Sequence, residues 1–148
     1  MFLKEEDGFE DAGVTSMKIV LLEAFFSGSH RQWAEGLQRF SKHEIEILSL
    51  PGRHWKWRMH GGAITLAKRF QQLQTKPDLI IATDMLDLGQ FLSLTRKETA
   101  QIPVAIYFHE NQLSYPWSPT DEDVELKRDR HYGWLNYTSA LAADTLFF

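Results

Sequence analysis

Short apolar-rich runs alternate with stretches of helical periodicity along most of the chain. The apolar runs lie at residues 19–22, 45–50, 79–82, 104–108 and 145–148. Between them, apolar residues recur every three or four positions, as at Trp33, Leu37 and Phe40, which predicts amphipathic helices. The helices predicted in this way lie around residues 33–40, 66–73, 88–95 and 132–143. This alternation is typical of an α/β protein, so we predict a Rossmann-like parallel sheet sandwiched by helices over residues 17–148.

Composition narrows the class of protein further. The chain has 148 residues, a formal net charge of −4 and no cysteine. The length fits one compact domain, and the absence of cysteine excludes disulfide frameworks, thiolate metal sites and cysteine nucleophiles. No apolar run reaches the roughly 18 residues that a membrane-spanning helix needs. We therefore expect a cytoplasmic protein with no membrane partner.

The two ends of the chain carry separate expectations. Residues 1–16 contain five acidic residues against one lysine, and we expect them to form a disordered acidic extension. At the other end, the apolar run at 145–148 predicts a fifth strand that begins where the chain stops. We interpret the chain as one piece of a longer protein.

Ligands of open α/β sheets bind at the carboxyl ends of the strands, so the segments that follow the strands are the places to search. After the first run, Gly28, Ser29 and His30 lead into a predicted helix. Backbone N–H groups there can approach a phosphate or a sugar. An ordinary turn with an N-cap explains the same residues equally well, and the chain has no G-x-G-x-x-G fingerprint for dinucleotides.

The segment after the second run, residues 51–62, is predicted to be a loop in which basic and aromatic residues interleave. Cations can contact phosphates while indoles stack on bases or sugar rings, which favours a binding role. The other interpretation is a solvated basic loop whose tryptophans pack on the core. The candidate binding residues are Arg53, His54, Trp55, Lys56, Trp57 and Arg58.

The densest cluster of polar residues follows the fourth run. His109, Glu110, Asn111 and Gln112 are consecutive there. A histidine can donate to a sugar hydroxyl or phosphate, and a carboxylate beside it can orient the ring or act as a base. We favour a functional site over a polar loop capped by its own side chains. The aromatic candidates in the same segment are Tyr115 and Trp117.

Two further signals are weaker. Asp84 follows the third run, and its favoured role is to cap the next helix, with binding of a ligand hydroxyl as the other interpretation. The basic cluster at 127–131 is interpreted as a solvated face in preference to a phosphate site. The six histidines show no metal-ligand spacing, and the chain has neither a P-loop nor a G-x-S-x-G nucleophile motif, so no metal is expected.

Five of these stretches together resemble one family. They are LEAFFSGSH at 22–30, RHWKWRM at 53–59, YFHENQLSYPW at 107–117, KRDRHYG at 127–133 and NYTSALAAD at 136–144. The chain is similar over about residues 17–148 to the glycosyltransferase-like family that includes tRNA-queuosine α-mannosyltransferase.

The resemblance implies a two-domain GT-B glycosyltransferase. This chain would be the N-terminal, acceptor-side domain, without the C-terminal domain that binds most of the nucleotide sugar, and inactive by itself. Mannose would pass from GDP-mannose to queuosine in the anticodon of tRNA, with no metal or other cofactor. His109 matches the place of a histidine that approaches the donor sugar in related enzymes, and Glu110 beside it is the second candidate catalytic residue.

Two other functions remain open at this point. The enzyme could glycosylate a glycan, lipid or metabolite, in which case Trp55, Trp57 and Trp117 would form sugar platforms. The isolated chain could also be a non-catalytic module that binds RNA or a nucleotide.

Overall fold

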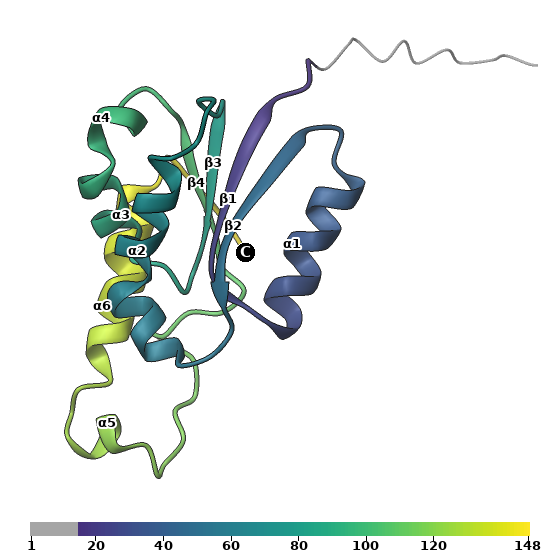
Figure 1. The fold of residues 1–148 in the computed structure, drawn as a ribbon. Helices are drawn as coiled ribbons and strands as arrows, with labels where there is room; N and C mark the ends of the chain where they lie inside the picture. Colours follow the sequence, from purple (N-terminus) through teal and green to yellow (C-terminus); the bar gives the residue numbers. More distant parts are fainter. Residues whose placement is uncertain (1–14) are drawn as a thin grey trace, which may run out of the picture.

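The protein is an α/β sandwich built on one five-stranded parallel sheet, as a computed structural model describes it for residues 15–148 (Figure 1). The expected extension at 1–16 lies outside the described residues except for its last two. In chain order the elements are β1 (Lys18–Phe26), α1 (Gly28–Phe40), β2 (Glu44–Pro51), α2 (Trp55–Phe70), β3 (Leu79–Thr83), α3 (Leu88–Leu94), α4 (Arg96–Thr99), β4 (Val104–Tyr107), α5 (Glu122–Glu125), α6 (Arg130–Ala142) and β5 (Thr145–Phe147). The predicted Rossmann-like α/β fold is confirmed.

The strand order is β2-β1-β3-β4-β5, and every neighbouring pair is parallel. In register, Ile19 of β1 lies opposite Ile45 of β2 and Leu79 of β3. The order of the strands reverses between β1 and β3, so the connections leave on opposite faces of the sheet there. Such a reversal opens a crevice at the carboxyl ends of the strands, where ligands of these folds bind.

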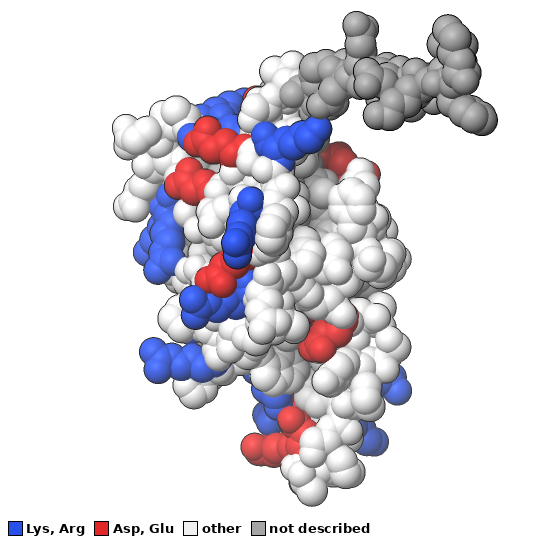
Figure 2. Space-filling view, turned by 90° about the vertical axis from the view of Figure 1, so that its right-hand side faces the viewer, with Lys and Arg blue, Asp and Glu red and all other residues white. Residues whose placement is uncertain are grey.

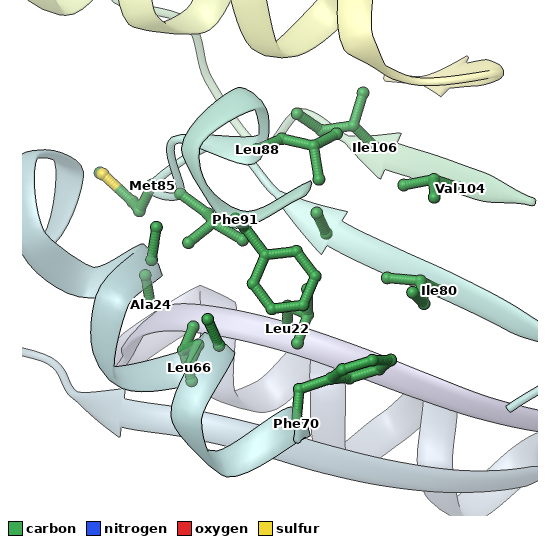
Figure 3. Packing of buried hydrophobic residues seen from close by; sticks show 14 of the residues in the cluster. Leu22, Ala24, Leu66, Phe70, Ile80, Met85, Leu88, Phe91, Val104 and Ile106 are labelled. Atoms are coloured by element: carbon green, nitrogen blue, oxygen red, sulfur yellow. The ribbon is translucent and has the colours of Figure 1, made fainter. Parts of the chain in front are cut away.

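Helices cover the two faces of the sheet unequally. The helix α1 lies alone on one face, whereas α2, α3 and α6 pack on the other (Figure 1). The larger core fills the space beneath the second group, where Leu22, Leu66, Ile80 and Phe91 are fully buried (Figure 3). The rings of Phe70 on α2 and Phe91 on α3 meet edge to face with centroids 5.4 Å apart. This contact joins the two helices over the middle of the sheet.

The prediction of a loop over residues 51–62 is wrong after residue 54. The helix α2 begins at Trp55 and runs through Gly61 and Gly62. Met59, Gly62 and Ala63 are buried at the spacing of one helical face. A Cβ on Gly62 would lie 3.4 Å from side-chain atoms of Ala24 and Leu50, an ordinary contact distance, so this face of the helix packs directly on β1 and β2. Tertiary packing thus overrides the low helix propensity of glycine.

The other helices follow the predicted ranges with small changes. Of the range 88–95, α3 covers Leu88–Leu94, and the short α4 follows from Arg96. Thr95 lies between the two helices, and its buried hydroxyl donates to the carbonyl of Phe91. The range 132–143 corresponds to α6. Within residues 15–148, the structure contains no helix with the length and apolar character needed to cross a membrane.

Candidate functional site

Four polar side chains meet at the carboxyl ends of β1, β3 and β4, and we call them the acid–histidine cluster: Glu23, His30, Asp84 and His109. His30 Nδ1 in the first turn of α1 lies 3.2 Å from Glu23 Oε2 at the end of β1. The imidazole of His30 also lies against that of His109, with ring centroids 4.0 Å apart. The backbone N–H of His109 donates to Asp84 Oδ1 at 3.1 Å. Three segments far apart in the sequence therefore form one polar cluster.

Burial decides the charges in this cluster. Glu23 is fully buried, and its second oxygen accepts from the backbone N–H of Phe25 at 2.9 Å. Burial alone would lower the pKa of His30, but the hydrogen bond and the charge of Glu23 raise it above the ordinary 6.5. Burial and the nearby charge of His30 lower the pKa of His109 to about 4. Near neutral pH, His109 is therefore an uncharged imidazole beside a Glu23–His30 pair.

Desolvation also acts on Asp84. Burial raises the pKa of Asp84 to about 7, against the opposing influence of His30 and of the hydrogen bond from His109. The carboxyl group is 2% exposed and therefore titrates near neutral pH. Because the backbone N–H of His109 binds this carboxyl group, the position of the loop that follows β4 (the β4 loop) depends on Asp84.

Aromatic rings hold the imidazole of His109 in place. The rings of Trp33 and Tyr107 are stacked, with centroids 4.3 Å apart, and both meet the His109 ring edge-on at 5.2 and 4.8 Å. His109 Nε2 is buried and has no hydrogen-bond partner among residues 15–148. A buried imidazole nitrogen without a partner is costly, so a hydroxyl or phosphate oxygen of a ligand would complete the site.

The same cluster contains potential metal ligands. Ligand atoms of Glu23, His30 and His109 lie within 4.8 Å of one another. The spacing of histidines along the chain did not reveal this group, because the three residues come from separate elements. Here His30 Nδ1 is paired with the carboxylate, and its ring stacks obliquely on His109. The contact between Glu23 and His30 has the geometry of an acid–imidazole pair. That the site holds no metal stays a prediction.

A Glu23→Gln variant of the complete protein tests the acid–histidine cluster. We expect the pKa of His30 to fall, because a neutral amide replaces the carboxylate that attracts the imidazolium. A titration of ¹⁵N-labelled imidazoles by NMR measures this shift directly. The control is Glu35→Gln, which removes the same charge from the exposed Arg31–Glu35 pair on α1. A His30 pKa that is equal in Glu23→Gln and in the unaltered protein would contradict this assignment.

The same variant has a predicted effect on stability. Because the pKa of His30 is higher in the folded state, the protonated form of His30 stabilises the fold. This contribution is fully present below pH 6.5, the ordinary pKa of histidine, and it is lost as the pH rises through the folded-state pKa. Glu23→Gln should therefore be more destabilising at acidic than at alkaline pH, as measured by urea unfolding at both.

The interpretation of Asp84 as a helix cap is wrong. The residue that caps α3 is Asp87, whose side chain accepts from the backbone N–H of Gln90 at 2.9 Å. Asp84 lies one turn earlier, buried beneath the β4 loop. Asn136 on α6 connects the same loops, since Nδ2 donates to the carbonyl of Asp84 and Oδ1 accepts from Gln112 N–H, both at 2.8 Å.

Glu23 and Asn136 are functional candidates that sequence reasoning missed. A carboxylate between Leu22 and Ala24, inside a strand buried on both faces, is the signal that could have identified Glu23. Nothing in the sequence around Asn136 distinguishes it from an exposed helix residue.

A cavity of about 330 Å³ opens beside the cluster, and we call it the carboxyl-end pocket. It brings together Trp55 from the second segment and four predicted residues from the fourth segment, namely Glu110, Gln112, Tyr115 and Trp117. Its lining consists of Phe25, Trp55, Met85, Glu110, Gln112, Tyr115, Pro116, Trp117, Ser118 and Asp121. Aromatic rings lie there together with two carboxylates and an amide, an arrangement suited to a flat ligand with several polar groups.

Lys56 lies between aromatic rings and acidic side chains. Its ammonium is 2.7 Å from Asp121 and 2.5 Å from Asp123, and it lies 5.4 to 6.0 Å from the ring centroids of three aromatic residues. Those rings contact one another, and we call them, with Lys56, the aromatic wall: Trp55, Trp117 and Tyr132. Burial lowers the pKa of Lys56, but its two hydrogen-bonded carboxylates outweigh burial and raise that pKa. The lysine therefore orders the α5 loop rather than standing free for a phosphate.

The remaining predicted residues do not enter the carboxyl-end pocket. Trp57 is 74% exposed, Arg53 is exposed, and Arg58 donates to the carbonyl of Pro51. His54 precedes α2 with a left-handed φ of 56°. Asn111 accepts from Ser114 N–H and Oγ, so this residue caps its own loop.

The turn before α1 stays open to a ligand. Gly28 has a φ of +52°, and nothing lies within 4 Å of a Cβ built on it. Ser27 makes no side-chain capping hydrogen bond to the helix. A Cβ on Gly52 would lie 2.0 Å from Ser27 Cβ, so the turns after β1 and β2 are packed against each other.

Comparison with known proteins identifies the family. The model of the family described as "tRNA-queuosine alpha-mannosyltransferase N-terminal" matches residues 18–148. A Drosophila melanogaster protein named tRNA-queuosine alpha-mannosyltransferase is 36% identical over 134 residues, which cover 88% of this chain and 33% of that protein. The chain thus spans about a third of the length of this relative. The chain belongs to the family of tRNA-queuosine alpha-mannosyltransferase N-terminal domains.

Proposed function

We propose that this chain is the N-terminal, acceptor-side domain of a cytoplasmic GT-B enzyme that transfers mannose from GDP-mannose to queuosine in the anticodon of tRNA. Membership of the family supports the reaction class and the acceptor. The parallel sheet, with its crevice between β1 and β3, supports a ligand site at the carboxyl ends. The nucleotide sugar would be held mainly by a second domain that follows this one in the complete protein.

The observation that carries the proposal is the environment of His109. Transfer breaks the bond between the sugar and the diphosphate, so positive charge develops on the sugar ring and negative charge on the leaving group. A neutral imidazole can bind a sugar hydroxyl without adding repulsion to that developing positive charge. The low pKa of His109, its buried Nε2 and its aromatic surroundings suit this task. The phosphates would approach Gly28, Ser29 and the N-terminus of α1.

The acceptor would enter the carboxyl-end pocket. A flat modified base fits between aromatic side chains, and Gln112 supplies both donor and acceptor groups. Glu110 lies next to His109 and lines the pocket, so its carboxylate can accept the proton of the attacking hydroxyl. We propose that the reaction needs no metal and no membrane.

A second acceptor class is supported by the surface charges. Figure 2 shows acidic and basic side chains mixed over the face that carries α1, without a continuous basic surface. A glycan, lipid or metabolite acceptor would need no such surface, and the carboxyl-end pocket would then hold a sugar.

Incubation of the complete protein with GDP-mannose and queuosine-containing tRNA tests the proposed function. Nucleoside digestion and mass spectrometry should show queuosine gaining the mass of one hexose. Transcribed tRNA that carries guanosine in place of queuosine is the matched control. A folded protein that binds tRNA but adds no hexose would reject this reaction and direct the search to other donors and acceptors. Transfer by residues 1–148 alone would show that this domain is sufficient.

A further inference from the structure

A second, larger cavity lies on the other side of the aromatic wall. It has a volume of about 730 Å³ and is formed by α2, the α5 segment and the start of α6. We call it the histidine cleft after its central pair, His60 and His131. Neither this pair nor the cleft takes part in the sugar chemistry proposed above.

Flat aromatic surfaces line the histidine cleft. The imidazoles of His60 and His131 are stacked, with centroids 4.9 Å apart and planes 12° from parallel. Trp57 also lines the cleft, with an indole that is 74% exposed. An indole at a cavity opening offers a face on which any nucleobase can stack.

Cations border the same cleft. Lys127 and Arg128 lie in the connection between α5 and α6, and both are exposed. Lys127 has a left-handed φ of 55°, a conformation that glycine adopts more readily than lysine. A lysine therefore occupies a position whose backbone conformation is unfavourable for it, and such outliers are often found at functional sites.

Carboxylates engage two of the three cationic side chains of the cleft, Lys56 and Arg128. Asp123 is engaged by Lys56 at 2.5 Å and by Arg128 at 3.1 Å. Glu122 reaches Arg128 only at 3.9 Å and points into solvent with an exposed side chain. Lys56 also binds Asp121 at 2.7 Å, so the three cationic side chains are balanced by three carboxylates. Lys127 is the one of these cations that forms no ion pair within residues 15–148.

The histidine cleft and the carboxyl-end pocket share one wall, so a single polymer can extend from one cavity into the other. Tyr132 lines the histidine cleft, whereas Trp55 and Trp117 line the carboxyl-end pocket. The ring centroid of Tyr132 lies 5.0 Å from that of Trp55 and 5.6 Å from that of Trp117. A strand with one nucleotide in the pocket would bring a neighbouring nucleotide over the wall and into the cleft.

We propose that the histidine cleft binds a nucleotide of the acceptor RNA that lies beside the nucleotide to be modified. Its base stacks on Trp57 and the paired imidazoles, and a phosphate contacts Lys127. The cleft thereby selects an RNA acceptor over a free nucleoside. This inference rests on the proposed function in taking the acceptor to be RNA and in placing the nucleotide to be modified in the carboxyl-end pocket.

Two single variants of the complete protein test the inference. Trp57→Ala removes the stacking face, and Lys127→Gly removes the charge while relieving the left-handed backbone, so neither change threatens the fold. The matched controls are Phe40→Ala, an aromatic residue that is 78% exposed at the end of α1, and Lys97→Ala on α4. The probe is a fluorescently labelled anticodon stem–loop without queuosine, and the Kd is measured at several salt concentrations without donor sugar.

We expect Trp57→Ala to raise the Kd about tenfold, as for loss of one base–aromatic stack. Lys127→Gly should reduce the slope of log Kd against log salt by about 1, which is the contribution of one phosphate contact. Both controls should bind as the unaltered protein does. Unchanged binding and an unchanged slope in the two variants would overturn the inference.

Separate readouts distinguish this inference from the proposed function. Mannosyl transfer to the free queuosine nucleoside should be unaffected by Trp57→Ala, whereas transfer to tRNA should lose kcat/KM in proportion to the loss of binding. Equal losses on nucleoside and tRNA would contradict a role of the cleft in RNA binding. If the protein transfers no mannose but its RNA binding still weakens in both variants, the proposed reaction is wrong and the role of the cleft in RNA binding stands.

Discussion

Replacing His109 with alanine in the complete enzyme should reduce mannosyl transfer by about 10²–10³-fold, the usual effect of losing one preorganised hydrogen-bond donor at a developing charge. Binding of tRNA should change by less than about twofold, because His109 lies in the acid–histidine cluster and not in the histidine cleft. Since the pKa of His109 is about 4, protonation of this residue should not reduce activity between pH 6 and 8. Single-turnover rates with saturating tRNA, measured over that range, report the chemical step.

The conservative variant His109→Asn serves as a control for packing. It keeps a short polar side chain against Trp33 and Tyr107 and should recover part of the activity lost in His109→Ala. Comparable thermal stability of both variants would show that the fold is retained. Full transfer activity in His109→Ala would remove this residue from the mechanism.

The largest expected effect on stability comes from Phe91. Its side chain is fully buried between the sheet and α2, against Phe70. Phe91→Ala should destabilise the fold by about 3–5 kcal/mol, because it removes apolar burial and leaves a cavity. For a domain of this size the unfolding midpoint should fall by roughly 10 °C. Differential scanning calorimetry of the complete protein measures this change for the transition that includes the N-terminal domain.

Phe40→Ala is the control for this prediction. Phe40 is 78% exposed, so its loss should change the stability by less than about 0.5 kcal/mol. Equal midpoints for Phe91→Ala and Phe40→Ala would show that the contact between α2 and α3 does not stabilise the fold.

The strands were predictable because burial on both faces leaves a strong local signal. A strand covered by helices needs apolar residues at consecutive positions, and runs such as 79–82 have few other structural explanations. The boundaries were less predictable. The strand β1 continues beyond Leu22 through Glu23 to Phe26, because its later residues pair with β2 and bury a carboxylate.

The start of α2 shows the limit of local reasoning. Proline, glycine and basic residues at 51–62 favour a loop, but burial of Met59 and Ala63 against the sheet favours a helix from Trp55 onward. Packing of this kind contributes more free energy than the propensity of two glycines removes. The basic and aromatic residues consequently lie on a rigid element, where Trp57 and His60 are one turn apart.

The parallel α/β architecture, the family and the segments that contain ligand chemistry are predictable from the amino-acid sequence, because apolar runs and the residues that follow them are local patterns. Which side chains act together depends on tertiary packing. It paired Glu23 with His30 and His109, neutralised Lys56 with Asp123, and placed the histidine cleft behind the aromatic wall. The charge of a buried group depends on the neighbours that burial brings to it, and those neighbours come from distant parts of the chain.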